Sequence, residues 1–239
     1  MFLQLSGLSK QFGSLVVTDN IDLDVRQGQA LGILGPNGAG KSTLFNLITG
    51  NLKPDTGTVL FEGKDVTSMP AHQRCALGIG RSFQIPKPFE EMTVFENLLV
   101  AASFGGGMAT KAAEDCSVEV LQQTGLLKRA NLPAGKLTLL ERKRLELARA
   151  MATRPKLLLL DEIAGGLTEA ECTSLVELIG QLNHDHGITV VWIEHVVNAL
   201  LQVVDELFVI DFGRELARGE PQSVMNNPEV QAVYMGVDA

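Results

Sequence analysis

The sequence predicts an α/β fold in which an antiparallel β region precedes the core sheet and a helical region is inserted into the core. Short apolar runs that are typical of buried strands occupy residues 30–34 and 157–160. Residues 2–5 and 21–25 alternate between apolar and polar side chains, as strands of a half-exposed antiparallel sheet do. Residues 93–152 carry helix-start signals and helical apolar spacing instead.

A phosphate-binding loop follows the first apolar run. Residues 35–43 read Gly-Pro-Asn-Gly-Ala-Gly-Lys-Ser-Thr, which fits G-x-x-x-x-G-K-[ST]. The glycines let the backbone turn its N–H groups toward phosphates, Lys41 reaches the β and γ phosphates, and the Ser42 hydroxyl ligates Mg²⁺. A strand, this loop and a helix from about Lys41 predict a P-loop NTPase core; the alternative is a glycine turn without chemistry. The predicted nucleotide-binding positions are Gly35, Pro36, Asn37, Gly38, Ala39, Gly40, Lys41, Ser42 and Thr43.

The composition is that of an acidic globular protein. The 239 residues include 20 Lys and Arg against 28 Asp and Glu, a net charge of -8, and no long basic run occurs. Nucleic acid is therefore not an expected partner. The three cysteines are far apart, which fits a reducing compartment. The N-terminus does not read as a signal peptide and no apolar run is long enough for a membrane span, so we expect any membrane role to depend on a partner.

Turn signals separate the elements after the loop. Gly50 ends the loop helix, residues 53–57 form a dense turn signal, and 58–61 read as a strand that leads into a hairpin turn. Residues 79–83 are a candidate strand that ends at Gln84, where a polar side chain is well placed for a ligand.

Three helices are expected in the helical region. Thr-x-x-Glu at 93–96 is a capping box that begins the first helix, and the glycines at 105–107 interrupt it as a flexible loop. The second helix runs from about 111 to 124. A second capping box at 138–141 begins the third helix, whose basic residues 142–144 are predicted to form a solvated face.

Acidic residues end the next apolar strand. Residues 157–160 lead into Asp161 and Glu162, and open α/β sheets bind ligands at the carboxyl ends of their strands. The alternative is a solvated strand end. A capping box at 168–171 predicts another helix, and a strand at 188–193 is followed by His195. A strand at 205–210 and a turn then lead to one further strand and short helices at the C-terminus.

These motifs stand in one order that resembles the ATP-binding cassette (ABC) family, the ATPase subunits of ABC transporters. The order comprises the phosphate loop, Gln84, the helix start at 137–141, the acidic strand end and His195. The resemblance covers essentially the whole chain. It implies one cassette domain over residues 1–239, with a helical subdomain at about 88–153 inserted into the α/β core.

The resemblance also implies roles for single residues, with ATP and Mg²⁺ as cofactors and Lys41 in the catalytic set. Asp161 holds Mg²⁺ through water, Glu162 is the general base, and Gln84 senses Mg²⁺ and couples the site to the membrane subunit. His195 contacts the γ phosphate. Phe12 matches the aromatic residue that stacks on adenine; the alternative for Phe12 is an apolar residue at a sheet edge.

One motif departs from the family. Residues 137–141 read Leu-Thr-Leu-Leu-Glu, where the signature is close to Leu-Ser-Gly-Gly-Gln and contacts the γ phosphate across a dimer. Thr138 keeps a hydroxyl, but Leu140 replaces a glycine, adds bulk and resists a positive φ by roughly 1–2 kcal/mol. The alternative is that this segment is now only a capped helix.

The subfamily follows from further similarities. Residues 80–86 (Gly-Arg-Ser-Phe-Gln-Ile-Pro), 89–97, 193–195 and the terminal 234–236 are similar to the ATPases of branched-chain amino acid importers. Residues 196–197 read Val-Val where that group often has Asp-Met. Importers of urea, amides and other small solutes share this style, so the solute is not fixed.

The resemblance therefore predicts an ATP-hydrolysing subunit of an importer for branched-chain amino acids or similar solutes, peripheral on the cytoplasmic face of the plasma membrane. Its expected partners are integral membrane permease subunits, a second ATPase copy or paralogue and, indirectly, a periplasmic or extracellular solute-binding protein. The alternatives are a soluble cassette ATPase acting on nucleic acid or ribosomes, a weakly hydrolysing regulatory cassette and an exporter ATPase.

Overall fold

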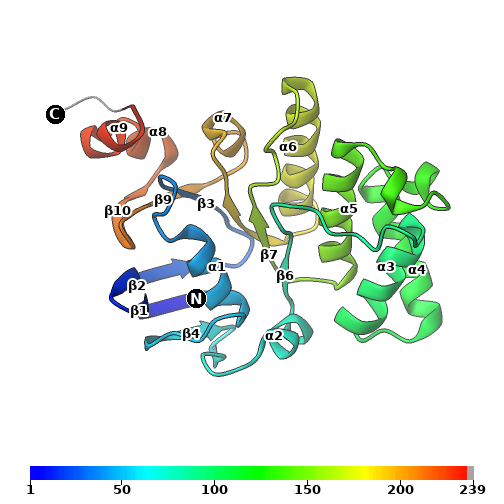
Figure 1. The fold of residues 1–239 in the computed structure, drawn as a ribbon, viewed down its shortest axis with the longest axis horizontal. Helices are drawn as coiled ribbons and strands as arrows, with labels where there is room; N and C mark the ends of the chain where they lie inside the picture. Colours follow the sequence, from blue (N-terminus) through cyan, green and yellow to red (C-terminus); the bar gives the residue numbers. More distant parts are fainter. Residues whose placement is uncertain (236–239) are drawn as a thin grey trace.

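Two β-sheets and the helices around them make up the computed structural model, which describes residues 1–235 (Figure 1). One sheet has the order β2-β1-β4-β5 and is antiparallel. The other has the order β10-β9-β3-β8-β7-β6 and is parallel except for β10. The strands are β1 (Leu3–Phe12), β2 (Leu15–Val25), β3 (Ala30–Leu34), β4 (Thr56–Phe61), β5 (Lys64–Asp65), β6 (Ile79–Arg81), β7 (Leu157–Asp161), β8 (Thr189–Ile193), β9 (Glu206–Asp211) and β10 (Arg214–Gly219).

The helices form two groups. α1 packs between the two sheets, whereas α3, α4 and α5 lie together beside the six-stranded sheet (Figure 1). Among residues 1–235, no helix combines the length and apolar character that crossing a membrane requires. The helices are α1 (Lys41–Thr49), α2 (Ala71–Leu77), α3 (Val94–Val100), a π-helical turn (Ala101–Gly105), α4 (Thr110–Gln123), short 3₁₀ turns (Leu127–Arg129 and Ala134–Lys136), α5 (Leu139–Ala152), α6 (Glu169–His184), α7 (Val197–Leu200), α8 (Pro221–Met225) and α9 (Pro228–Met235).

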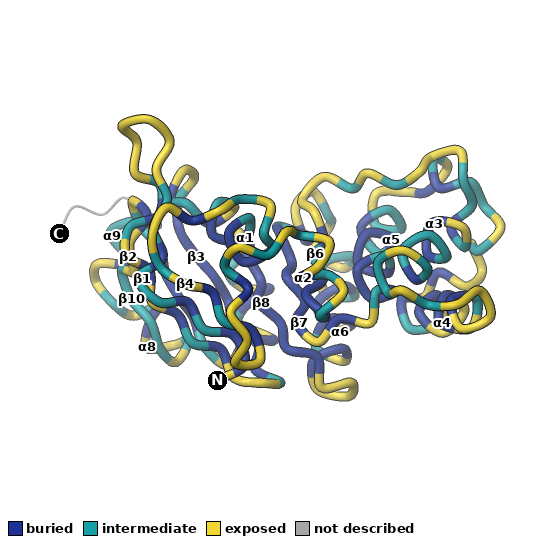
Figure 2. The backbone as a smooth tube through the Cα atoms, turned by 90° about the horizontal axis from the view of Figure 1, so that it is seen from below, coloured by how far each residue is buried: buried dark blue, intermediate teal, exposed yellow. Residues whose placement is uncertain are grey.

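Two apolar cores hold these layers together. The first fills the space between the sheets and includes α1, and the second joins the other face of the six-stranded sheet to α3–α6. Strands β3, β7 and β8 are buried at every position (Figure 2). This burial on both faces explains why their sequences are continuous apolar runs rather than alternating ones.

Most of the expected elements are present, with local differences. All three predicted capping boxes are formed, at the starts of α3, α5 and α6. The strand expected at 79–83 is shorter, because β6 ends at Arg81 and Ser82 makes the last ladder bond, to Leu159 O at 2.9 Å. Helix α2 was not predicted. Gly236 of the terminal 234–236 motif lies outside the described residues.

The expected flexible loop at 105–107 is wrong in part. Gly105 belongs to the π-helical turn that continues α3, and a Cβ atom at this position would lie 2.7 Å from Cγ2 of Thr153. Glycine is therefore required here because the turn packs closely against the end of α5, and not because the backbone is flexible.

Arg74 fixes the end of the loop helix. This arginine of α2 is only 1% exposed, and its guanidinium donates to the carbonyls of Leu47 (2.7 Å) and Ile48 (2.8 Å) in the last turn of α1. It also donates to the carbonyls of Thr67 and Met69, both at 2.9 Å. A cation at the carboxyl end of a helix is favourable, so Arg74 stabilises the helix that follows the phosphate loop.

Arg74→Met is expected to lower the free energy of unfolding by about 3 kcal/mol, because each buried carbonyl that loses its donor costs about 1 kcal/mol or more. At this chain length the melting temperature then falls by about 6–12 °C in calorimetry. Arg26→Met, at an exposed position, is the control and should change it by less than about 2 °C. A loss below about 1 kcal/mol in Arg74→Met would contradict this role.

Candidate functional site

The phosphate loop leads into a helix start that is open to a ligand. Gly40 is the N-cap of α1 with φ 105°, and α1 has neither a side-chain cap nor an acidic residue in its first turn. Within the described residues, the N–H groups of Lys41, Ser42 and Thr43 make no hydrogen bond. A Cβ atom on Gly40 would lie 2.3 Å from the Val17 carbonyl oxygen, so only glycine fits there.

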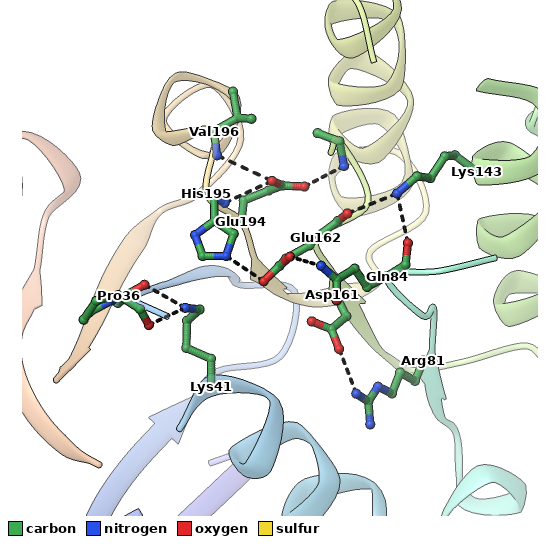
Figure 3. A network of polar contacts seen from close by, with 12 residues as sticks. Pro36, Lys41, Arg81, Gln84, Lys143, Asp161, Glu162, Glu194, His195 and Val196 are labelled. Carbon is green, nitrogen blue, oxygen red and sulfur yellow. Dashed lines mark hydrogen bonds and ion pairs between the residues drawn. The ribbon is translucent and has the colours of Figure 1, made fainter. Parts of the chain in front are cut away.

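Lys41 lies inside this loop. Its ammonium group donates to the carbonyls of Gly35 at 2.7 Å and Pro36 at 3.0 Å, and the residue is buried (Figure 3). Burial lowers the pKa of Lys41, while the carboxylates of Glu162 and Asp161 act in the opposite direction. A lysine held by its own loop and facing two acids is placed to exchange these carbonyls for phosphate oxygens.

Asp161 ends β7 and is neutralised by Arg81, an arginine that no sequence motif marks as a site residue. The Arg81 guanidinium donates to Asp161 at 2.8 Å and to the Asn46 side chain of α1 at 2.6 Å. Both charged side chains are nearly buried. Arg81 ends the neighbouring parallel strand, so the pair follows from the register of β6 and β7.

Glu162, Gln84 and His195 meet in one contact group. One carboxylate oxygen of Glu162 lies 2.7 Å from Nε2 of His195, and the other accepts a hydrogen bond from the Gln84 amide (Figure 3). Glu162 has φ 46°, a left-handed conformation that costs a non-glycine residue roughly 1–2 kcal/mol. Such strain is often retained at functional sites.

A buried acidic residue, Glu194, supports the backbone next to this group. Glu194, only 1% exposed, accepts from the N–H groups of Ala164 (2.6 Å) and His195 (3.1 Å). Burial raises the pKa of Glu194, and the nearby charge of Glu162 acts in the same direction. Glu194 follows an apolar strand as Asp161 ends one, so the strand-end rule that selected Asp161 also applies to it.

The prediction of a solvated face at 142–144 is wrong. Lys143 is buried and donates to the carbonyls of Gln84 and Glu162, whereas Arg142 and Arg144 donate to carbonyls of neighbouring segments. Helix α5 lies between the six-stranded sheet and helices α3 and α4 (Figure 1), so this part of it faces protein rather than water.

Comparisons with known proteins agree with this geometry. The family model described as "ABC transporter" matches residues 18–165. The chain belongs to the ATP-binding cassette transporter family. A second model, described as "Branched-chain amino acid ATP-binding cassette transporter", matches residues 214–239 of the cassette. The resemblance predicted from the ordered motifs is thereby confirmed.

Relatives and solved structures match the cassette along nearly its full length. The high-affinity branched-chain amino acid transport ATP-binding protein LivG of Escherichia coli K12 is 38% identical, over 98% of this chain and 97% of its own. BraF of Pseudomonas aeruginosa, of the same description, is 37% identical with the same coverage. A crystal structure of a nucleotide-free ATP-binding cassette is 31% identical with a TM-score of 0.89, and a cassette in its ADP conformation is 32% identical with a TM-score of 0.88; each covers 99% of both chains.

The residues of the cassette fit a Mg²⁺-bound nucleotide. The unpaired N–H groups at the start of α1 and the Lys41 ammonium suit phosphate oxygens. Ser42, Gln84 and Asp161 line one groove, and their hydroxyl, amide and carboxylate oxygens are the ligands that Mg²⁺ prefers.

Phe12 and Thr138 were also predicted to bind nucleotide, and neither is among the residues that line this groove. Phe12 ends β1 and is 47% exposed, with Lys10 Nζ 5.6 Å from its ring centre. Thr138 is exposed as the N-cap of α5, where its hydroxyl accepts from the Glu141 N–H. Leu140 lies within α5 and outside the positive-φ residues, so the strain expected from a left-handed leucine does not arise.

Lys41→Ala is expected to weaken Mg·ATP binding about 10- to 100-fold in isothermal titration calorimetry, because a charge-assisted hydrogen bond contributes about 1.5–3 kcal/mol. Lys53→Ala, an exposed lysine beyond α1, is the control and should leave the affinity unchanged. Equal affinities for Lys41→Ala and the wild type would contradict the assignment of this loop as the nucleotide site.

Proposed function

We propose that this chain is the ATP-hydrolysing subunit of an ABC importer for branched-chain amino acids or similar small solutes. The observation on which the chemistry depends is the placement of Glu162 between Gln84 and His195, beside the groove that Ser42 and Asp161 line. The names of LivG and BraF and the C-terminal family match at 214–239 support the solute class.

In the proposed hydrolysis each of these side chains has a separate role. Lys41 and the free N–H groups of α1 bind and orient the phosphates, and Glu162 accepts a proton from the attacking water. His195 holds one oxygen of that carboxylate and Gln84 holds the other. Mg²⁺, which Ser42 and Asp161 would hold with Gln84, supplies positive charge that neutralises the phosphate oxygens.

The transporter role follows from the assembly that we infer. Residues 1–239 form one cassette domain, with about 88–153 as its helical subdomain, and a second copy or a paralogue pairs with it around ATP. In that pair Thr138 of one cassette faces the phosphate loop of the other. The cassette binds integral membrane permease subunits on the cytoplasmic face of the plasma membrane and serves a periplasmic or extracellular solute-binding protein indirectly. The net charge of -8 argues against nucleic acid as a partner.

Glu162→Gln is expected to lower kcat by about 100-fold or more, because the amide cannot act as a base. Since the ATP then persists, the variant should form a dimer in Mg·ATP, measured by light scattering after gel filtration. Glu177→Gln on the exposed face of α6 is the control and should hydrolyse ATP like the wild type. A Glu162→Gln protein that stays monomeric at high concentration in ATP would contradict the paired assembly. A wild type that scarcely turns over ATP would instead favour a regulatory cassette, in agreement with Leu140 in the signature.

Purification of the tagged chain from membranes should recover a permease with several membrane spans.

Cells that carry Lys41→Ala in place of the wild type should lose ATP-dependent uptake of labelled leucine, isoleucine or valine, because the loop no longer binds nucleotide. Recovery of ribosomes or nucleic acid, with ATPase activity that these stimulate, would contradict the importer role.

A further inference from the structure

Lys143 is, like Lys41, a buried lysine without a salt bridge among the described residues, but it lies outside the phosphate loop. It lies in the second turn of α5 and is 4% exposed. Its ammonium donates to the Gln84 carbonyl at 3.0 Å and to the Glu162 carbonyl at 3.3 Å (Figure 3). Burying a cation is unfavourable, so a lysine at this position calls for a reason beyond packing.

The contact between Lys143 and the Glu162 carbonyl fixes the backbone of Glu162. The Glu162 N–H donates to the Ile193 carbonyl of β8 at 2.8 Å, and the Glu162 carbonyl accepts from Lys143. Both backbone groups of this left-handed residue therefore have partners. The N–H bonds to the sheet, and the carbonyl accepts from Lys143 of α5 and, at 3.4 Å, from the Gly165 N–H. The direction of the carboxylate toward His195 depends on this backbone conformation.

The contact between Lys143 and the Gln84 carbonyl fixes the loop that carries Gln84. This loop follows the end of β6 and is exposed, and the Gln84 carbonyl is held by Lys143 while its side chain reaches Glu162. One ammonium group thus joins the backbones of two segments, residues 82–86 and 161–164, whose side chains meet in the contact group.

The surrounding charge is also consistent with a cation at this place. Glu162 and the buried Glu194 lie close to each other, and their like charges repel. The carboxylates of Glu194 and Glu162 raise the pKa of Lys143, although burial lowers it more strongly. The Lys143 ammonium is therefore attracted by both acids, which partly offsets the cost of burying it.

We propose that Lys143 is a positioning residue that holds Glu162 and Gln84 at the separation needed for hydrolysis. The proposal rests on the proposed roles of Glu162 and Gln84. Lys143 lies five residues after Thr138, on the helix that Thr138 caps. It therefore also links the position of the signature segment, residues 137–141, to the position of Glu162. A displacement of α5 then moves both carbonyls, and with them the contact group.

The variants Lys143→Met and Lys143→Arg test this role in the full chain. Lys143→Met keeps the length and apolar stem but removes both donors, and we expect kcat to fall about 10- to 100-fold, as for misplaced catalytic groups. The KM for ATP and the affinity for Mg·ATP should stay within about twofold, because the phosphate loop is not touched. Lys143→Arg keeps the charge and the donors, and it should restore most of kcat. Lys128→Met, an exposed lysine of a 3₁₀ turn, is the control.

Hydrogen exchange of the nucleotide-free proteins distinguishes positioning from general stability. In Lys143→Met, peptides that cover 82–86 and 161–165 should exchange faster than in the wild type, while those of β8 should not. Lys143→Leu, which also lacks a donor, replaces the methionine variant if that one does not fold.

Two results would overturn the proposal: a folded Lys143→Met or Lys143→Leu protein with kcat within about twofold of the wild type, or unchanged exchange in both peptides. A wild type without ATPase activity would overturn the proposed function alone, because the exchange comparison does not require catalysis.

Discussion

The parallel pairing of β8 with β3 on one side and β7 on the other is the constraint on which the site depends. In this register Ile33 pairs with Ile193, and Ile193 pairs with Asp161. The carboxyl ends of the three strands therefore meet at one edge of the sheet. The segment that follows each strand forms a different part of the site. The phosphate loop follows β3, Asp161 and Glu162 are at the end of β7, and His195 follows β8.

The need of each acidic side chain for a partner explains most of the remaining contacts. Asp161 faces the Arg81 guanidinium, Glu162 faces His195, and the buried Glu194 accepts from backbone N–H groups. Each carboxylate at this edge has a partner from another element, because an isolated buried charge is unfavourable. Lys143 belongs to the same arrangement, although it acts on carbonyl oxygens. These contacts join α1, α5 and the parallel strands around one small volume.

The departure from the family signature has a limited structural effect. Thr138 caps α5 with a complete capping box, and Leu140 adopts the ordinary conformation of a helical residue. The backbone N–H groups at the start of α5 are therefore presented as a helix start, with the bulk of two leucines beside them.

The sequence by itself determined the elements and the chemistry of single residues. Buried parallel strands read as apolar runs, capping boxes mark three helix starts, and the phosphate loop has fixed spacing, so each of these is a local signal. Strand ends also revealed Asp161, Glu162 and His195 as polar residues at the edge of a sheet. By contrast, the shortened β6 and the packed Gly105 depend on neighbours that are distant in sequence.

Only the tertiary structure decided which of these residues are in contact and which hydrogen bonds fix their positions. Lys143 read as part of a solvated basic run, because no local pattern indicates that α5 faces the strand ends. The partners of Asp161, Glu162 and Glu194 likewise come from other segments of the chain. The two residues of a pair are 19 positions apart for Lys143–Glu162, 30 for Ala164–Glu194 and 80 for Arg81–Asp161. A contact at such a separation is set by strand register and helix packing, and these are properties of the whole fold.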